Sequence, residues 1–397
     1  MPDLRFAPPP ALRVADRGGG LNQTSVRTYN ERLVMSLLRQ HDSLSRMELG
    51  RFSGLSAQTI SVIVRALERD GLILAGKAQR GRVGPPSTPM ALNPDGAFAV
   101  GVKVGVNVTD LVLIDFVGAQ RHYLRHHYAS PAPDAIIAQL VENLRTAIAT
   151  LPAAKRDRIV GIGVALANDI EMWPQGGRID GSNAWDVVGF EAALAAATGL
   201  PVYIQNDVTA AAGAELIFGA ARTIGDFAYF FVGYESASRL VLNHHVYAGR
   251  RGATPAEGST ATGLVSLTDL DTALRDAGLE PDRIWLSPQG DWSNFGETLD
   301  SWVNSCGDSL ADAIAFLCAF VDLNNVIVGG RLPASVARSL IDRVAAQLKD
   351  RLKLGSAAPS VALGDVGPFA KAIGAAGLVF HSRFMVEEVG LAADAPE

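Results

Sequence analysis

The sequence is poor in cysteine, in charged residues and in long apolar runs. Its 397 residues include two cysteines, Cys306 and Cys318, which form no CxxC pair and therefore predict no disulfide framework. No apolar stretch reaches the ~18 residues needed to cross a bilayer, and residues 1–20 lack the apolar core of a signal peptide. We therefore expect a cytoplasmic globular protein, whose length favours two or three structural units.

Charge is distributed unevenly along the chain. The net charge is −6, but residues 21–92 contain ten basic and five acidic side chains, and residues 1–20 add one further positive charge. The remaining residues therefore carry a net charge of −12. A basic N-terminal segment on an acidic body predicts that this segment binds a polyanion.

Residues 25–93 have the periodicity of a helix-turn-helix. Asn30 is expected to cap a first helix, and the segment Ser45–Glu48 has the form of a capping box that opens a second one. Gly54 is expected to make the turn, and Ser56 to cap a third helix. Apolar residues recur in the third helix at the spacing of a buried face: Ile60, Ile63, Val64 and Leu67.

Two short apolar stretches, residues 72–74 and 89–92, flank the loop GKAQRGRVGPPST. Such a pair of stretches predicts a hairpin, which would form a basic wing beside the three helices. A helix-turn-helix with a wing can place its third helix in the major groove of DNA. The pattern therefore predicts a winged helix-turn-helix that binds double-stranded DNA.

The exposed face of the third helix is expected to read bases. Gln58 can pair bidentately with adenine, and Arg65 can reach guanine or a phosphate. The other predicted DNA contacts are Ser56, Ala57, Thr59 and Ser61 on the helix and Lys77, Arg80 and Arg82 in the wing. The alternative is a small helical domain for protein contacts with a solvated charged face. We favour DNA binding because the caps, the turn, the wing and the charge asymmetry would otherwise all be coincidences.

Residues 94–385 alternate strand-like and helical segments, which predicts an α/β domain with a mixed sheet. The expected organisation is a disordered tail at 1–24, the winged helix-turn-helix at 25–93, the α/β domain at 94–385 and a short tail at 386–397.

Several segments carry a resemblance to a known family. SRMELGRFSGLSAQTISVIVRALERDGLI resembles the helix-turn-helix of the ROK family (repressor, open reading frame, kinase), in the branch of the xylose and N-acetylglucosamine repressors. GRVGPPSTPMALNPDG is similar to the wing and linker of that branch, and LPVYIQNDVTAAAGAE, VDLNNVIVGGRLP and PFAKAIGAAGLVF resemble segments of its α/β body. The resemblance covers residues 25–385 and implies a two-lobed, actin-like ATPase and sugar-kinase fold behind the winged helix-turn-helix.

The chain departs from the kinases of this family at both phosphate-binding hairpins. Where they have a segment like Asp-Ile-Gly-Gly-Thr-Lys, this sequence has a lysine, Lys103, in the acidic position and retains one glycine, Gly105. Where they have Gly-x-Gly-Ile-Gly-x-Gly, it has Gly233–Arg239, in which Glu235 would face phosphates with a negative charge. Because phosphoryl transfer depends on positioning phosphates, we expect a domain that does not bind ATP and is not an enzyme.

The zinc ligands of the family are also missing. Family members often hold Zn²⁺ with a histidine and a cysteine cluster, but this chain has two cysteines 12 positions apart. The histidine and glutamate of the family's Glu-x-Gly-His motif align with Ser259 and Ala256, and Glu257 is one position away. We expect no metal ion and no other cofactor.

The resemblance leaves a set of candidate ligand-binding residues: Asn183, Asn206, Asp207 and Glu257. In family kinases the residue at Asp207 is the general base, and without ATP it can only hydrogen-bond a ligand. The alternative is that Asp207 caps a helix expected from Thr209 to Phe218. Asn183 and Trp185 match sugar-contacting positions of the family, and the alternative for them is a turn with a packed aromatic ring.

These observations predict a transcriptional regulator, expected to be a repressor of carbohydrate-related genes, that forms a homodimer or tetramer and responds to a small-molecule effector such as a sugar derivative. Two alternatives remain. An active sugar kinase with a DNA-binding head would be detected by a coupled assay with ATP and a panel of hexoses. A regulator without an effector, whose body only dimerises, would show no response in a thermal-shift screen with sugars.

Overall fold

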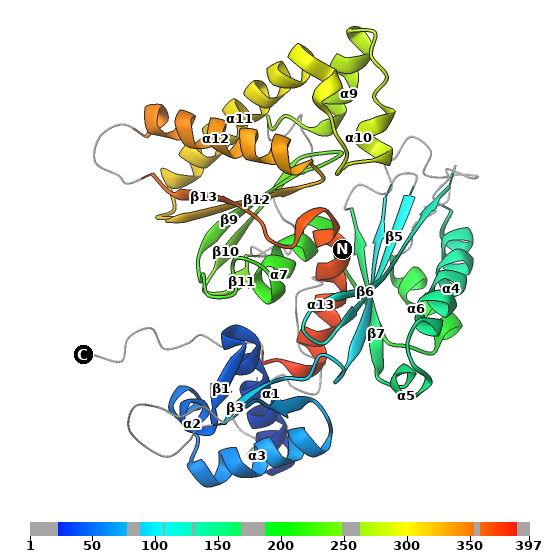
Figure 1. Ribbon diagram of the computed structural model, residues 1–397, viewed down its shortest axis with the longest axis vertical. Coiled ribbons are helices and arrows are strands. Elements are labelled where there is room, and N and C mark those ends of the chain that lie inside the picture. The colour runs from blue at the N-terminus through cyan, green and yellow to red at the C-terminus, as the bar shows by residue number, and fades with distance from the viewer. Residues whose placement is uncertain are drawn as a thin grey trace. The chain divides into compact units, whose positions relative to one another are not determined.

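The computed structural model describes residues 23–77, 88–105, 108–128, 132–167, 187–247, 263–352 and 358–386. The chain divides into two compact units (Figure 1). The first unit comprises Leu4–Ala210 and Ala372–Glu397, and the second comprises Ala211–Lys371 together with Met1–Asp3. None of the helices in the described ranges is both long and apolar enough to span a bilayer.

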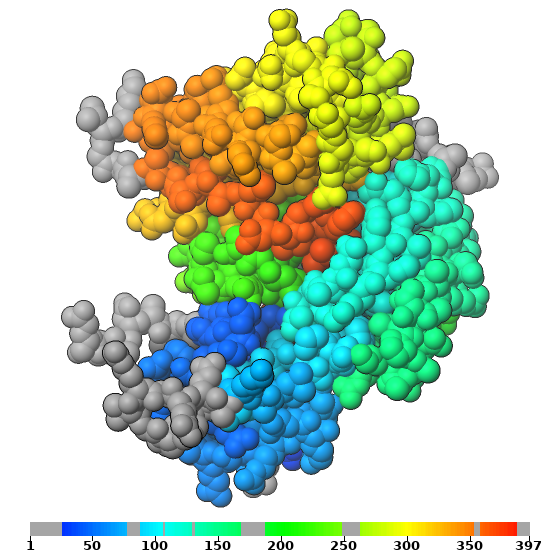
Figure 2. Space-filling view, in the orientation of Figure 1, coloured from blue at the N-terminus to red at the C-terminus, as the bar shows by residue number. Residues whose placement is uncertain are grey.

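The first unit begins with a winged helix-turn-helix, the blue part of the surface in Figure 2. Its elements are α1 (Gln23–His41), β1 (Ser43–Ser45), α2 (Arg46–Ser53), α3 (Ala57–Arg69), β2 (Ile73–Ala75) and β3 (Pro89–Leu92). The three strands pair antiparallel in the order β1-β3-β2. The predicted hairpin is confirmed, and β1, which is too short to leave a sequence pattern, completes its sheet.

Local hydrogen bonds explain where the helices begin. The Ser45 hydroxyl accepts from the Glu48 amide at 3.3 Å, while the Glu48 carboxylate accepts from the Ser45 amide at 2.8 Å, so the predicted capping box is confirmed. Gly54 has φ 69° at the end of α2, and Ser56 caps α3. The cap predicted at Asn30 is wrong, because α1 begins at Gln23 and Asn30 lies inside it.

The rest of the first unit is built on a five-stranded sheet of order β6-β5-β4-β7-β8. The strands are β4 (Phe98–Val104), β5 (Val108–Asp115), β6 (Gln120–His127), β7 (Ile159–Leu166) and β8 (Val202–Asn206). Strands β4, β7 and β8 are parallel, and β5 is antiparallel to both of its neighbours. One face packs an apolar core beneath α4 (Pro133–Ala149) and α6 (Val187–Thr198), and α5 (Ala153–Arg156) follows α4.

The opposite face of this sheet packs against α13 (Ala370–Phe384) at very short range. A Cβ atom added to Gly163 would overlap the carbonyl group of Ala375, and one added to Gly101 would overlap that of Ala372. Gly374 on α13 makes an equally close approach to Ala210 of α7 (Asp207–Phe218). Glycine is therefore required at these positions because the helix and the strands meet backbone to backbone.

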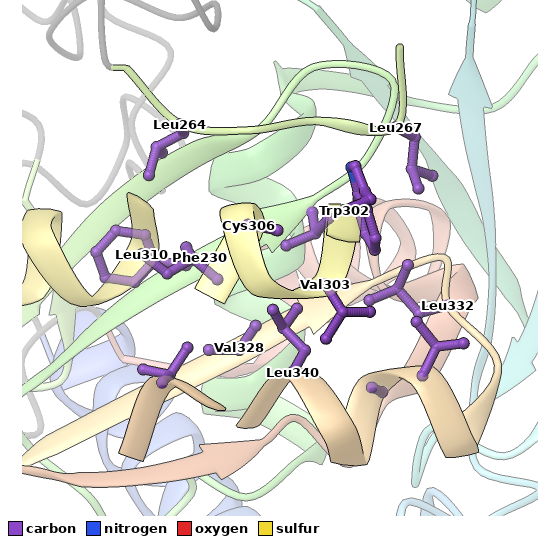
Figure 3. Packing of buried hydrophobic residues seen from close by; sticks show 14 of the residues in the cluster. Phe230, Leu264, Leu267, Trp302, Val303, Cys306, Leu310, Val328, Leu332 and Leu340 are labelled. Carbon is purple, nitrogen blue, oxygen red and sulfur yellow. The ribbon is translucent and has the colours of Figure 1, made fainter. Parts of the chain in front are cut away.

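The second unit has a five-stranded sheet of order β11-β10-β9-β12-β13. Its strands are β9 (Phe227–Val232), β10 (Ala237–Leu242), β11 (His245–Val246), β12 (Asn325–Gly330) and β13 (Ser360–Leu363). Helices α11 (Gly296–Cys318) and α12 (Ala334–Arg351) enclose an apolar core with it, in which Phe230, Leu310 and Leu340 are buried (Figure 3). The unit also contains α9 (Leu267–Asp276), α10 (Asp282–Leu286) and the 3₁₀ turns η3 (Ser293–Phe295) and η4 (Gly367–Phe369).

We predict that Gly163→Ala destabilises the first unit, because the added methyl group would overlap the Ala375 carbonyl. Overpacking of this kind costs about 1–3 kcal/mol of the free energy of unfolding. Gly50→Ala is the matched control, since its Cβ would lie 3.4 Å from the nearest atom, the Leu55 carbonyl oxygen. Urea denaturation measures both variants, and equal stability of Gly163→Ala and wild type would contradict the close packing.

Candidate functional site

The residues predicted to read DNA lie on the exposed side of α3. Gln58 and Arg65 are exposed and Ser61 is half-buried. The apolar residues predicted for the opposite face, Ile60, Ile63, Val64 and Leu67, are all buried. At the start of the helix, Ser56 and Ala57 are exposed and Thr59 is half-buried, with its amide 3.2 Å from the Ser56 hydroxyl. Helix α3 can therefore contact DNA with this face without disturbing the apolar core of the winged helix-turn-helix.

Val62 was missed by the sequence analysis and belongs to the same face. Its side chain is 55% exposed, and it lies one helical turn after Gln58. An exposed valine on a recognition helix can contact the methyl group of thymine. The i, i+4 spacing from Gln58 was the signal for it. In the wing, Lys77 is exposed after β2, whereas Arg80 and Arg82 lie outside the described residues.

The helix-turn-helix is anchored to the body through a buried arginine on α1. Arg39 donates a hydrogen bond to the carbonyl oxygen of Phe116, at the end of β5, and its guanidinium lies 5.3 Å from the centre of the Phe116 ring. Phe116 in turn makes edge contacts with Phe380 and Phe384 of α13, with ring centres 5.2 and 5.0 Å apart. These contacts connect α1 with α13 through one aromatic side chain.

A second set of contacts reinforces this connection. The hydroxyl of Ser36 on α1 accepts a hydrogen bond from the amide of Val386, just after α13, at 3.1 Å. On the wing side, Arg158 of the body donates to the carbonyl oxygen of Gly71, in the turn after α3, at 3.5 Å. The helix-turn-helix is therefore held by the body at α1 and at the turn after α3.

The candidate ligand residues Asn206 and Asp207 lie where β8 passes into α7. The side-chain oxygen of Asn206 accepts hydrogen bonds from the amides of Val208 and Thr209 at 3.0 and 2.9 Å. Asn206 is thus the residue that caps α7, and the helix begins at Asp207, two residues earlier than predicted. Capping therefore does not explain Asp207, whose side chain is 5% exposed in the first turn of the helix.

Polar side chains cross the sheet in register with this position. In the strand register, Arg125 on β6 lies opposite Asp110 on β5, and Asp110 lies opposite Lys103 on β4. Lys103 in turn lies opposite Ala165 on β7, and Ala165 lies opposite Gln205 on β8. Cross-strand partners lie on the same face of a sheet. The four residues Arg125, Asp110, Lys103 and Gln205, named here the polar row, therefore share one face, which is the face that carries Gly101 and Gly163.

Asp110 is the buried centre of the polar row. Its carboxylate accepts hydrogen bonds from Arg125 Nε and from the Tyr123 hydroxyl, both at 2.7 Å, and the residue is 5% exposed. Burial lowers the pKa of Arg125, but its hydrogen bond and ion pair with Asp110 outweigh this and raise the pKa above its usual value. Arg125 is therefore charged near neutral pH.

The first hairpin, between β4 and β5, is closely packed around Gly105. The Lys103 ammonium lies so close above Gly105 that a Cβ atom there would overlap it. The Tyr128 hydroxyl donates to the Gly105 carbonyl, and the Gly105 amide donates to Val108 at 2.8 Å. Lys103, rather than a glycine-lined space, therefore forms this side of the site.

The second hairpin, between β9 and β10, is occupied in a different way. The Ser236 hydroxyl donates to the Val265 carbonyl at 2.8 Å, and the Thr268 hydroxyl donates to that of Tyr234 at 3.1 Å. The Leu267 amide donates to Gly233 at 2.8 Å. This hairpin is thus hydrogen-bonded to the start of α9 through its carbonyl groups and Ser236. The other two candidate ligand residues, Asn183 and Glu257, lie outside the described residues.

The two cysteines cannot bind one metal ion together. They are 12 residues apart on α11, which corresponds to about 18 Å along the helix axis. Cys306 is buried and donates to the Val265 carbonyl at 3.7 Å, and burial raises the pKa of its thiol to about 12. Among the residues that the structure describes, no three histidine, cysteine or acidic side chains are grouped as metal ligands.

Comparisons with known proteins match both parts of the chain. Residues 99–263 match the model of the ROK family, and residues 27–73 match that of winged helix-turn-helix DNA-binding domains. Protein y4fQ of Sinorhizobium fredii is 26% identical over 91% of this chain and 93% of its own length. The xylose repressor of Bacillus spizizenii is 24% identical over 58% of this chain, and the match spans 60% of that repressor.

A solved structure has the same overall fold. The crystal structure of a ROK family transcriptional regulator, a homologue of the Escherichia coli MLC protein, matches with a TM-score of 0.64 and 18% identity, over 90% of this chain and 98% of that one. The predicted fold, a winged helix-turn-helix followed by a sugar-kinase-like α/β domain, is confirmed.

We predict that Gln58→Ala and Arg65→Ala each weaken specific DNA binding, because both side chains are exposed on α3. Loss of a good base contact costs about 1–3 kcal/mol of discrimination. Gel-shift titrations with a selected duplex and a scrambled duplex measure this. Arg145→Ala is the control, since Arg145 is an exposed arginine of α4 in the body. Retention of full specificity by both α3 variants would show that another element reads the DNA.

Proposed function

We propose that the chain is a transcriptional repressor of carbohydrate-related genes, because residues 99–263 match the model of the ROK family and residues 27–73 match that of winged helix-turn-helix DNA-binding domains. In this proposal residues 25–93 bind the operator, and residues 94–385 form a sensor domain without kinase activity that responds to a small polar ligand. The observation that carries the proposal is the exposed polar face of α3, with Gln58 and Arg65, on a helix whose other face is buried.

The absence of kinase activity is proposed from the two hairpins. Lys103 lies over the only glycine described in the first hairpin, and Ser236 and its neighbours in the second are hydrogen-bonded to the start of α9. A kinase needs open, glycine-lined backbone at these places to approach the phosphates of ATP. The proposal therefore assigns Asp207 a hydrogen-bonding role toward a ligand rather than the role of a general base.

The contacts of α1 supply a physical route from ligand to DNA. A ligand changes DNA affinity only if it binds one conformation of the protein better than another. Phe116 connects Arg39 of α1 with α13. Helix α13 in turn packs on the sheet whose strand β8 leads directly to Asp207. A shift of α13 against the sheet would therefore change the support of the helix-turn-helix, and a coupling of about 1–3 kcal/mol would suffice for induction.

We further propose that the protein acts as a homodimer or tetramer. One winged helix-turn-helix makes few base contacts, whereas two copies can bind two half-sites and so reach useful selectivity. Light scattering at micromolar concentration is predicted to give at least twice the mass of the 41.8 kDa chain. A strictly monomeric species would contradict this part of the proposal.

Asp207→Asn tests the ligand-binding role. The variant keeps the size of the side chain, and Asn206 still caps α7, so we predict that folding persists. The loss of charge is predicted to weaken binding of a compound that stabilises the wild type in a thermal-shift screen of sugars, sugar phosphates and amino sugars. Calorimetric titration measures the affinity. An affinity equal to that of the wild type would mean that the ligand binds elsewhere.

A further inference from the structure

We infer that the connection between the winged helix-turn-helix and the body of the first unit determines which spacing of two DNA half-sites the protein accepts. Its positioning residues are Arg39, Phe116 and Arg158, which need not touch DNA. The inference rests on the proposed function, because two copies must bind two half-sites, and it adds a specificity that base contacts do not supply. It is carried by the linker after the wing, the contacts of α1 and the turn after α3.

The linker between β3 and β4, residues 93–97, is short and is hydrogen-bonded to the helix-turn-helix. The Asn93 amide donates to the Leu72 carbonyl at 2.9 Å, and the Asn93 side chain donates to the Gly71 carbonyl at 2.6 Å. A Cβ atom added to Gly96 would lie 3.0 Å from the same Gly71 oxygen. The linker therefore packs directly against the turn that follows α3.

The same linker is bonded to the body. The Phe116 amide donates to the Pro94 carbonyl at 3.1 Å, and Lys155 on α5 pairs with Asp95 at 2.7 Å. Residues 93–95 thus each have a printed contact on one side of the linker or the other. A linker of five residues that is bonded in this way gives the helix-turn-helix little freedom to rotate against the body.

Helix α1 adds a contact far from the linker in sequence. The Arg39 side chain donates to the Phe116 carbonyl, and its guanidinium lies 5.3 Å from the centre of the Phe116 ring. Arg39 is 9% exposed and Phe116 is fully buried. Moving α1 away would take an acceptor from a buried charge, which is more costly than breaking an exposed hydrogen bond. Phe116 therefore holds α1 with its carbonyl and ring while its amide holds the linker.

Arg158 fixes the end of the recognition helix. Its side chain donates to the carbonyl groups of Gly71 at 3.5 Å and Gly96 at 3.1 Å, and its own carbonyl accepts from the Phe98 amide at 2.9 Å. Gly71 follows α3 by two residues, and Phe98 is the first residue of β4. One arginine thus joins the turn after α3, the linker and the first strand of the sheet.

A fixed connection has a consequence for the operator. In a dimer, the two recognition helices must meet half-sites whose centres are separated by a set number of base pairs. Each added base pair moves one half-site by about 3.4 Å and rotates it by about 35° around the duplex axis. A freely rotating helix-turn-helix could follow such changes, whereas one held at α1 and at the turn after α3 cannot.

The alternative is that these contacts only stabilise the fold. Removing them would then lower the melting temperature and leave the accepted spacing unchanged. If they set the spacing, their removal would broaden the range of accepted spacings, while the sequence of each half-site, which α3 reads, would stay the same.

The experiment uses the full chain. Duplexes are selected from a random library, and the distance between enriched half-sites is counted. We expect one dominant spacing for the wild type, and in gel shifts about tenfold weaker binding when the selected half-sites are moved two base pairs closer or further apart. A dimer that binds duplexes of all spacings equally well would overturn the inference.

Variants assign the preference to the connection. Arg39→Gln and Arg158→Gln are each expected to reduce the tenfold difference to about threefold or less, with unchanged affinity for a duplex that carries a single half-site. Arg156→Gln is the matched control, because Arg156 donates to the carbonyl groups of Leu151 and Ala149 within the body. If Arg39→Gln does not fold, Arg158→Gln decides alone.

An unchanged spacing preference in the folded variants overturns the inference. Loss of affinity for the single half-site also overturns it, because these arginines would then act on DNA affinity rather than on spacing. Light scattering and single half-site binding keep the proposed function separate: a monomer contradicts the proposed dimer together with this inference, whereas a dimer that reads its half-site but tolerates every spacing contradicts the inference alone.

Discussion

The packing of α13 on the first-unit sheet is the contact on which the rest of this unit depends. Gly101 and Gly163 bring the strand backbone against the carbonyl groups of Ala372 and Ala375. Any displacement of the first half of the helix from the sheet would break these contacts. The second half carries the rings that pack around Phe116. One helix is thus in contact with the sheet of the polar row and with the support of the DNA-binding head.

The proposed response to a ligand would pass through these contacts. Packed interiors respond to strain by switching between discrete arrangements rather than by deforming smoothly. Ser36 on α1 contacts Val386 just after α13, and Arg39 on α1 contacts Phe116 just after β5. Helix α1 is therefore in contact with the ends of both elements. These contacts form a continuous path between the sheet and the helix-turn-helix. Ligand titrations with and without DNA would measure the coupling free energy between the two.

The sequence predicted those features that depend on neighbouring residues. The capping box at Ser45–Glu48, the cap at Ser56 and the wing hairpin are local, and the structure confirms each of them. The first half of α11 also has apolar residues at helical spacing, Leu299, Trp302, Val303 and Cys306, which were a local signal that the prediction did not use. Helix α9 had local signals as well, the capping box of Ser266 and Asp269 and the spacing of Leu267, Leu270 and Leu274, whereas the five residues of α10 are too few to show a period.

Features that depend on register or on distant contacts could not be predicted. The polar row joins residues from four strands, and a shift of one residue in any pairing would move its side chains to the opposite face. Arg39 and Phe116 are 77 positions apart, and nothing in the local pattern pairs them. Capping of α7 by Asp207 was the alternative to ligand contact, and the cap is Asn206 instead, because two adjacent capping residues cannot be ranked without the backbone conformation.

The most direct test of the central claim is a selection of duplexes by the full chain from a random DNA library, followed by sequencing. The account predicts enrichment of a motif with two inverted half-sites, their centres separated by one or more helical turns of about 10–10.5 base pairs. Recovery of duplexes with no motif above the starting library, at a salt concentration where the chain still binds DNA, would contradict it.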